Sequence, residues 1–125
     1  MTTGGLTMTL MDEEMKAELL AFLVVGQLVA LARSGDWLRT DHLIESSWIW
    51  LSSNGARCDW LTRARLVAAA RELAPQVHDW PFPKDETGLL RLFNLQSGWF
   101  LDYRSEIVQR LHAVCAEYLE RHITG

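Results

Sequence analysis

The chain has 125 residues, of which 49% are hydrophobic and 22% charged, a balance typical of one globular domain rather than a disordered segment. Its net charge of −4 argues against a general nucleic-acid binder and is compatible with a basic protein partner. Its two cysteines do not make a disulfide framework, and they predict a reducing, cytoplasmic compartment.

The N-terminal part predicts a short tail and then a long helix. Residues 1–8 are rich in Gly and Thr, so we expect them to be flexible, with one helical domain over residues 9–125. Thr9, followed by Asp12, predicts a capped helix start with an acidic first turn. This first helix should end near Arg33, just before a glycine.

The most informative stretch is Leu19–Ala32, in which only Gly26 and Gln27 interrupt the apolar residues. A helix that is apolar on all sides must be enclosed by other helices, by a second copy of the chain or by lipid. Fourteen residues are fewer than the roughly 20 that span a bilayer, and the acidic residues before them exclude a secretory signal. We therefore expect no membrane association.

A second helix is predicted from a cap at Asp36 or Thr40 to Asn54-Gly55. On the side away from its main apolar face, four residues at spacings of 4, 3 and 4 form one ridge: Leu38, His42, Glu45 and Ile49. This ridge is either a strip that contacts a partner or a surface on which a neighbouring helix packs.

Asp59 predicts the cap of a third helix that runs from Trp60 to Ala74 and is halted by Pro75. Together with the preceding turn, this helix could form a helix-turn-helix DNA-binding unit whose basic residues are Arg57, Arg63, Arg65 and Arg71. Against DNA binding, Arg63 and Arg65 point nearly opposite ways. Pairing of the arginines with the many carboxylates is the simpler explanation.

Residues 75–84 predict an extended loop, because aromatic and proline residues alternate in it, among them Trp80 and Phe82. A short helix should follow, capped by Asp85 or Thr87 and continuing through Leu95. The pair Trp99-Phe100 follows the next glycine. The last helix is the most regular, starting near Asp102 or Ser105 and ending near His122.

No motif predicts a specific reaction or a cofactor. His42 and Glu45 share a helix face, but no second pair with metal-ligand spacing accompanies them. Cys58 precedes a helix and adjoins Arg57, a setting that can activate a thiol, although no histidine is adjacent in sequence. A small helical enzyme or a metal protein is therefore an alternative interpretation only.

The sequence as a whole predicts an all-α bundle of about five helices around the first one. Six tryptophans exceed what so small a core needs, so some should face a partner or a second copy in a homodimer. We expect a small acidic regulator that binds and inhibits another protein, as an anti-activator or an immunity protein does. The expected contact residues are Leu38, His42, Glu45, Ile49, Trp80, Phe82, Trp99 and Phe100.

Overall fold

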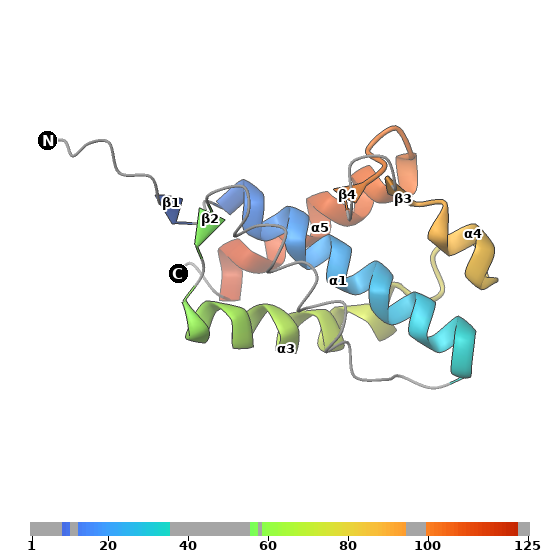
Figure 1. Ribbon diagram of the computed structural model, residues 1–125, viewed down its shortest axis with the longest axis horizontal. Helices are drawn as coiled ribbons and strands as arrows, with labels where there is room; N and C mark the ends of the chain where they lie inside the picture. The colour runs from blue at the N-terminus through green and yellow to red at the C-terminus, as the bar shows by residue number, and fades with distance from the viewer. Residues whose placement is uncertain (1–8, 11–12, 36–55, 58, 95–99, 123–125) are drawn as a thin grey trace, which may run out of the picture.

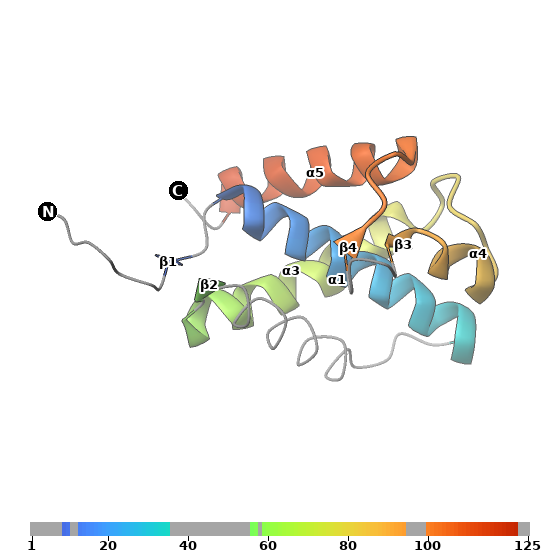
Figure 2. The same ribbon diagram turned by 45° about the horizontal axis from the view of Figure 1, so that its top comes forward.

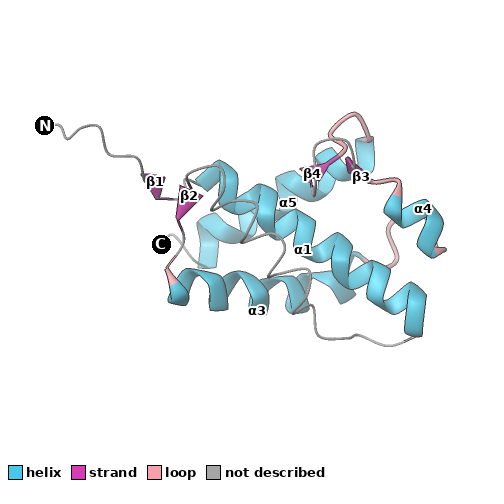
Figure 3. Ribbon diagram, in the orientation of Figure 1, coloured by secondary structure: helices cyan, strands magenta, loops and turns pink. Residues whose placement is uncertain are grey.

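The computed structural model describes residues 9–10, 13–35, 56–57, 59–94 and 100–122 (Figure 1). These residues form four helices and four two-residue strands, so the predicted all-α class is confirmed (Figure 3). The helices are α1 (Glu13–Ser34), α3 (Trp60–Val77), α4 (Glu86–Leu90) and α5 (Glu106–His122). Five helices were expected; the one predicted over residues 36–54 lies outside the described part.

The first helix lies at the centre of the bundle. Figures 1 and 2 show α1 between α3 on one side and α5 on the other, with α4 close to its C-terminal end. Every residue from Leu19 to Val29 is buried, which includes the polar side chain of Gln27 at 1% exposure. One chain therefore encloses this helix over most of its length, and no second copy is needed to cover it.

By length and composition alone, α1 could cross a membrane, contrary to the expectation from its fourteen-residue apolar stretch. The structure accounts for this apolar character in another way. In the most hydrophobic window of the helix, 67% of the residues are buried inside the fold, as a core helix requires.

The ends of α1 differ in how well local sequence predicted them. The predicted start at Thr9 is wrong, because Thr9 lies in the parallel pairing of β1 (Thr9–Leu10) with β2 (Ala56–Arg57) and the helix begins at Glu13. The predicted end is confirmed. Gly35 adopts a positive φ of 76°, and its N–H donates to the carbonyl of Leu31 at 2.7 Å.

Helix α3 begins where the sequence predicted and ends later. The carboxylate of Asp59 accepts hydrogen bonds from the backbone N–H and the hydroxyl of Thr62, at 2.8 and 2.9 Å. The bond from the backbone N–H is the first cause that lowers the pKa of Asp59. The predicted stop at Pro75 is wrong. This proline removes one backbone donor close to the helix end, and the extra turn buries Val77 against the core.

The C-terminal third forms a short helix, a strand pair and a long helix. Asp85 caps α4 by accepting from the N–H of Gly88 at 3.3 Å, which confirms that choice of cap. The helix is shorter than expected, because Phe93–Asn94 (β3) pairs antiparallel with Phe100–Leu101 (β4). Helix α5 has the predicted bounds, and it buries Val108, Leu111, Cys115 and Leu119.

We predict that the packing of α1 carries most of the stability. Replacing Leu23, which is 1% exposed, by alanine should lower the free energy of unfolding by about 3 kcal/mol. The same change at Leu61, which is 55% exposed, should cost less than about 0.5 kcal/mol. Urea denaturation followed by circular dichroism measures both values. Equal losses in the two variants would contradict the central position of α1.

Candidate binding surfaces

Trp60 and Leu61 are the exposed large hydrophobic residues of the described part, at 78% and 55% exposure. They occupy the first turn of α3. The helix buries Leu66, Ala70 and Leu73, so its opposite side faces solvent. There Arg65 and Ala68 follow Leu61 at spacings of four and seven, and both are exposed. We call Trp60, Leu61, Arg65 and Ala68 the α3 outer face.

Sequence reasoning missed this surface. Trp60 was considered there only as the first residue of the predicted third helix. The sequence could have shown this surface through the angular positions of the apolar residues around α3. Leu66 follows Leu61 by five positions, or about 140° around the helix, so the two cannot both point into one narrow core stripe.

In the loop that was predicted to carry Trp80 and Phe82 as contact residues, these two aromatic side chains pack against the rest of the fold, whereas His78, Asp79, Pro81 and Lys84 are exposed. Phe82 is only 4% exposed, so little of its surface is open to a partner protein, and its role as a contact residue stays a prediction. Trp80 is half-buried, stacks on the Phe82 ring with centroids 6.1 Å apart, and lies under the Arg110 guanidinium at 3.9 Å. These contacts attach the loop to α5 through a cation–π interaction.

The other expected contact residues remain predictions. Leu38, His42, Glu45, Ile49 and Trp99 lie outside the described residues. Phe100 is the first residue of β4 and pairs with Asn94.

The arginines of the predicted DNA-binding segment do not gather on one described face. Arg57 belongs to β2, whereas the other three lie along α3. Arg63 is half-buried, and Arg65 and Arg71 are exposed at positions about 120° apart around the helix. This spread gives no continuous basic surface that could follow a nucleic-acid backbone.

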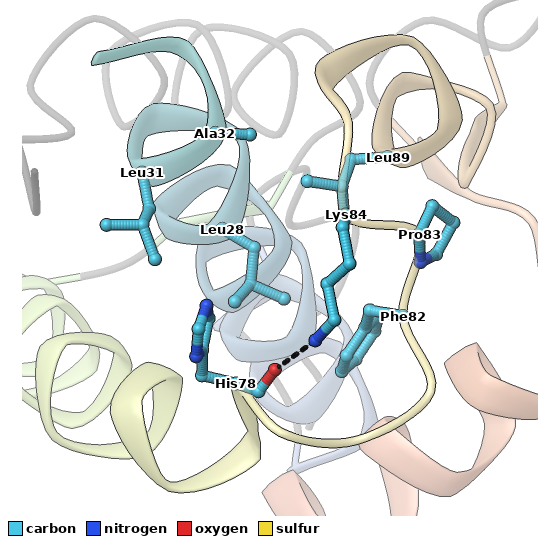
Figure 4. Close-up of a pocket in the computed structure, with 8 residues that line it drawn as sticks. All are labelled: Leu28, Leu31, Ala32, His78, Phe82, Pro83, Lys84 and Leu89. Carbon is cyan, nitrogen blue, oxygen red and sulfur yellow. Dashed lines mark hydrogen bonds between the residues drawn. The ribbon is translucent and has the colours of Figure 1, made fainter. Parts of the chain in front are cut away.

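A second surface feature is a cleft of about 230 Å³ at the C-terminal end of α1 (Figure 4). Its apolar lining comes from Leu28, Leu31, Ala32, Phe82, Pro83 and Leu89. Lys84 and His78 complete the lining. Figure 4 shows the Lys84 side chain reaching down between Phe82 and Leu28 to the carbonyl oxygen of His78. We call this site the α1–α4 cleft.

A second hollow, of about 390 Å³, lies between the start of α1 and the second half of α5. It is lined by three glutamates, by His112 and by the apolar residues Ala17, Ala116 and Leu119. The rings of His112 and Tyr103 meet edge to face, with centroids 5.4 Å apart. Nearby, the Tyr103 hydroxyl is buried without a hydrogen-bond partner, and burial raises its pKa. Burial, followed by the charge of Glu14, also raises the pKa of Glu18.

The metal site and the reactive thiol considered from the sequence can be compared with the described residues. No group of three or more His, Cys, Asp or Glu residues there could hold a metal ion. Cys115 is buried, and burial raises the pKa of its thiol, so it behaves as a small apolar residue. Cys58, the other thiol considered, lies outside the described residues.

The chain was compared with protein-family models, with curated proteins and with solved structures, and none of them matches it. Functional inference therefore depends on the geometry above. Two described surfaces offer apolar groups to another molecule, the α3 outer face and the α1–α4 cleft.

Truncation of Trp60, in α3, and of Trp80, in the loop after α3, should affect stability differently. Trp80→Ala should lower the free energy of unfolding by about 2 kcal/mol, since it removes stacking on Phe82 and the contact with Arg110. Trp60→Ala should change it by less than about 0.5 kcal/mol, because that side chain is mostly in solvent. Thermal and urea unfolding test both variants. A stable Trp80→Ala protein would show that the loop is not anchored.

Proposed function

We propose that this protein is a small acidic helical regulator that binds another protein and blocks its functional surface. The observation that carries the proposal is the exposure of Trp60 and Leu61 side by side in the first turn of α3. A folded domain gains nothing by leaving two such side chains in water. Burial against a partner is worth about 1.5–3 kcal/mol for a fully covered Leu, and tryptophan is among the commonest hot-spot residues.

The charge around the α3 outer face suggests the chemistry of the contacted surface. Residues 57–71 hold four arginines and one aspartate, a local charge of +3 in a chain of net charge −4. Arg65 lies one turn after Leu61 on the same side of the helix. An apolar pocket with a carboxylate placed to meet Arg65 would complement this face. The overall acidic charge had suggested a basic partner, so the local charge changes that expectation.

The DNA-binding alternative has less support. It needs basic side chains that track one groove, whereas the described arginines are distributed around α3 and Arg63 is half-buried. An enzymatic function has less support still, because the described thiol is buried and no metal-binding group is described. A cytoplasmic location fits the regulator proposal.

Removing the apolar pair should abolish partner binding without unfolding the protein. We predict that tagged wild-type protein recovers one protein in near-stoichiometric amount from lysate of the native host. The double variant Trp60→Ser, Leu61→Ser should recover at least tenfold less, because it lacks the apolar anchors. The captured protein is identified by mass spectrometry, and its activity is then measured with and without the regulator.

The matched control is Ala113→Ser, which makes a polar substitution at an exposed position of α5. It should bind like the wild type, since Ala113 lies outside the α3 outer face. Circular dichroism must show equal helical content in all three proteins. Undiminished binding by the double variant would remove the α3 outer face from the proposal, and shifted DNA in a mobility assay would favour the DNA-binding alternative.

The expected homodimer is a separate proposal. One chain already covers α1, so self-association would depend on the α3 outer face instead. We predict that sedimentation equilibrium at micromolar concentration detects a dimer in the wild type and a monomer in the Trp60→Ser, Leu61→Ser variant. A monomeric wild type would contradict the dimer and leave the face for a different protein.

A further inference from the structure

The α1–α4 cleft combines an apolar wall with one cationic group. Six of its lining side chains are apolar and come from α1, from the loop after α3 and from α4. Typical sites for drug-sized ligands measure about 300–1,000 Å³, so a cleft of about 230 Å³ suits a smaller molecule. An engineered apolar cavity of about 150 Å³ holds benzene. The cleft can therefore accept one compact apolar ring or a short branched chain.

Lys84 places a positive charge beside this apolar wall. Its Nζ donates to the carbonyl oxygens of His78 at 2.8 Å and of Trp80 at 3.5 Å. Both acceptors are neutral, and an ammonium group has three N–H donors. Two backbone bonds fix the position of Nζ and leave one donor. Figure 4 shows this nitrogen between the Phe82 ring and the end of the Leu28 side chain.

No carboxylate neutralises Lys84 among the described residues. Its neighbour Asp85 accepts from the N–H of Gly88, and Glu86 forms an ion pair with Arg33 at 2.6 Å. Asp79 is exposed and forms no ion pair with the lysine. The Lys84 side chain is exposed, so water solvates its charge in the free protein, and a bound anion would replace part of that water.

From these observations we propose that the α1–α4 cleft binds a small organic anion, a carboxylate attached to a compact apolar body. The apolar body would contact Leu28, Phe82 and Leu89, and the carboxylate would accept the remaining Lys84 N–H. His78, at the rim, would lie near the same carboxylate. Such a site is independent of protein binding, because it lies at the C-terminal end of α1, whereas the α3 outer face begins at the opposite end of the bundle (Figure 1).

Capping of the preceding helix is the simpler role for Lys84. Its two carbonyl acceptors lie at and just after the C-terminal end of α3, where a cation interacts favourably with the helix dipole. Capping alone does not require the apolar hollow around the ammonium group. The two roles predict different ligand binding, since only the proposed site distinguishes an anion from a neutral molecule of the same shape.

The test uses benzoate as the probe and benzyl alcohol as its neutral counterpart, titrated into the full chain labelled with ¹⁵N. We expect saturable shifts of the backbone amides of Ala32, His78 and Leu89, with millimolar affinity for benzoate. Benzyl alcohol should bind at least tenfold more weakly. Amides near Leu61, in the first turn of α3, should not shift.

Two variants test the contributions of the Lys84 charge and of the cleft volume separately. Lys84→Met should weaken benzoate binding at least tenfold, whereas Lys16→Met, which removes the other lysine of the chain, should not change it. Since loss of the cap could loosen the loop, Ala32→Trp provides a second variant that fills the cleft from its exposed rim and leaves Lys84 in place. It should abolish binding of both probes.

Three results would overturn the proposal. The first is the absence of shifts at about 20 mM benzoate, roughly 20-fold above a dissociation constant of about 1 mM. It would show that the cleft holds no such ligand. Equal affinity for benzoate and benzyl alcohol would show that Lys84 contributes no anion recognition. Unchanged benzoate binding by the Ala32→Trp variant would place the ligand elsewhere. None of these results bears on the capture experiment, which tests the α3 outer face.

Discussion

The rest of the structure depends on the need to cover α1 on every side. An ordinary amphipathic helix can leave one face in water, but α1 is buried continuously from Leu19 to Val29. Helices α3 and α5 meet this need from two sides, and α4 and β4 contact it as well. Each flanking helix packs its apolar side against α1. Consequently, groups that can act on other molecules lie on the outer sides of these helices or where the cover of α1 ends.

The sequence predicted those features that short-range chemistry determines. Asp59 and Asp85 cap their helices through backbone N–H groups three residues later, and Gly35 ends α1 with a positive φ. The periodicity of α5 also predicted its buried stripe, because Val108, Leu111, Cys115 and Leu119 recur at intervals of three and four. Such features need no knowledge of the neighbouring elements.

The wrong predictions concern features that contacts between distant parts of the chain determine. Thr9 can cap a helix in isolation, but here it pairs with a strand far along the chain. Pro75 disfavours a helix locally, yet burial of Val77 favours one more turn. Phe82 and Trp60 are both large aromatic residues, and only the packing of α3 and its loop against α1 and α5 makes the first buried and the second exposed. The candidate site was therefore the least predictable part.

The lengths of the helices explain why a cleft forms at the C-terminal end of α1. At 1.5 Å per residue, the 22 residues of α1 extend about 33 Å, whereas the 18 of α3 and the 17 of α5 extend about 27 and 26 Å. Both covering helices are thus shorter than the helix they cover, and Figures 1 and 2 show α1 extending beyond them toward α4. Burial falls accordingly, from Val29 through the half-buried Leu31 to the exposed Ala32. A loop and a five-residue helix cover this end incompletely, and the stem of Lys84 lies over part of the apolar surface that remains. Because this end of α1 is covered incompletely, a hollow remains there, and Lys84 lies at its wall. An apolar wall beside a cationic group is the combination that an apolar anion requires.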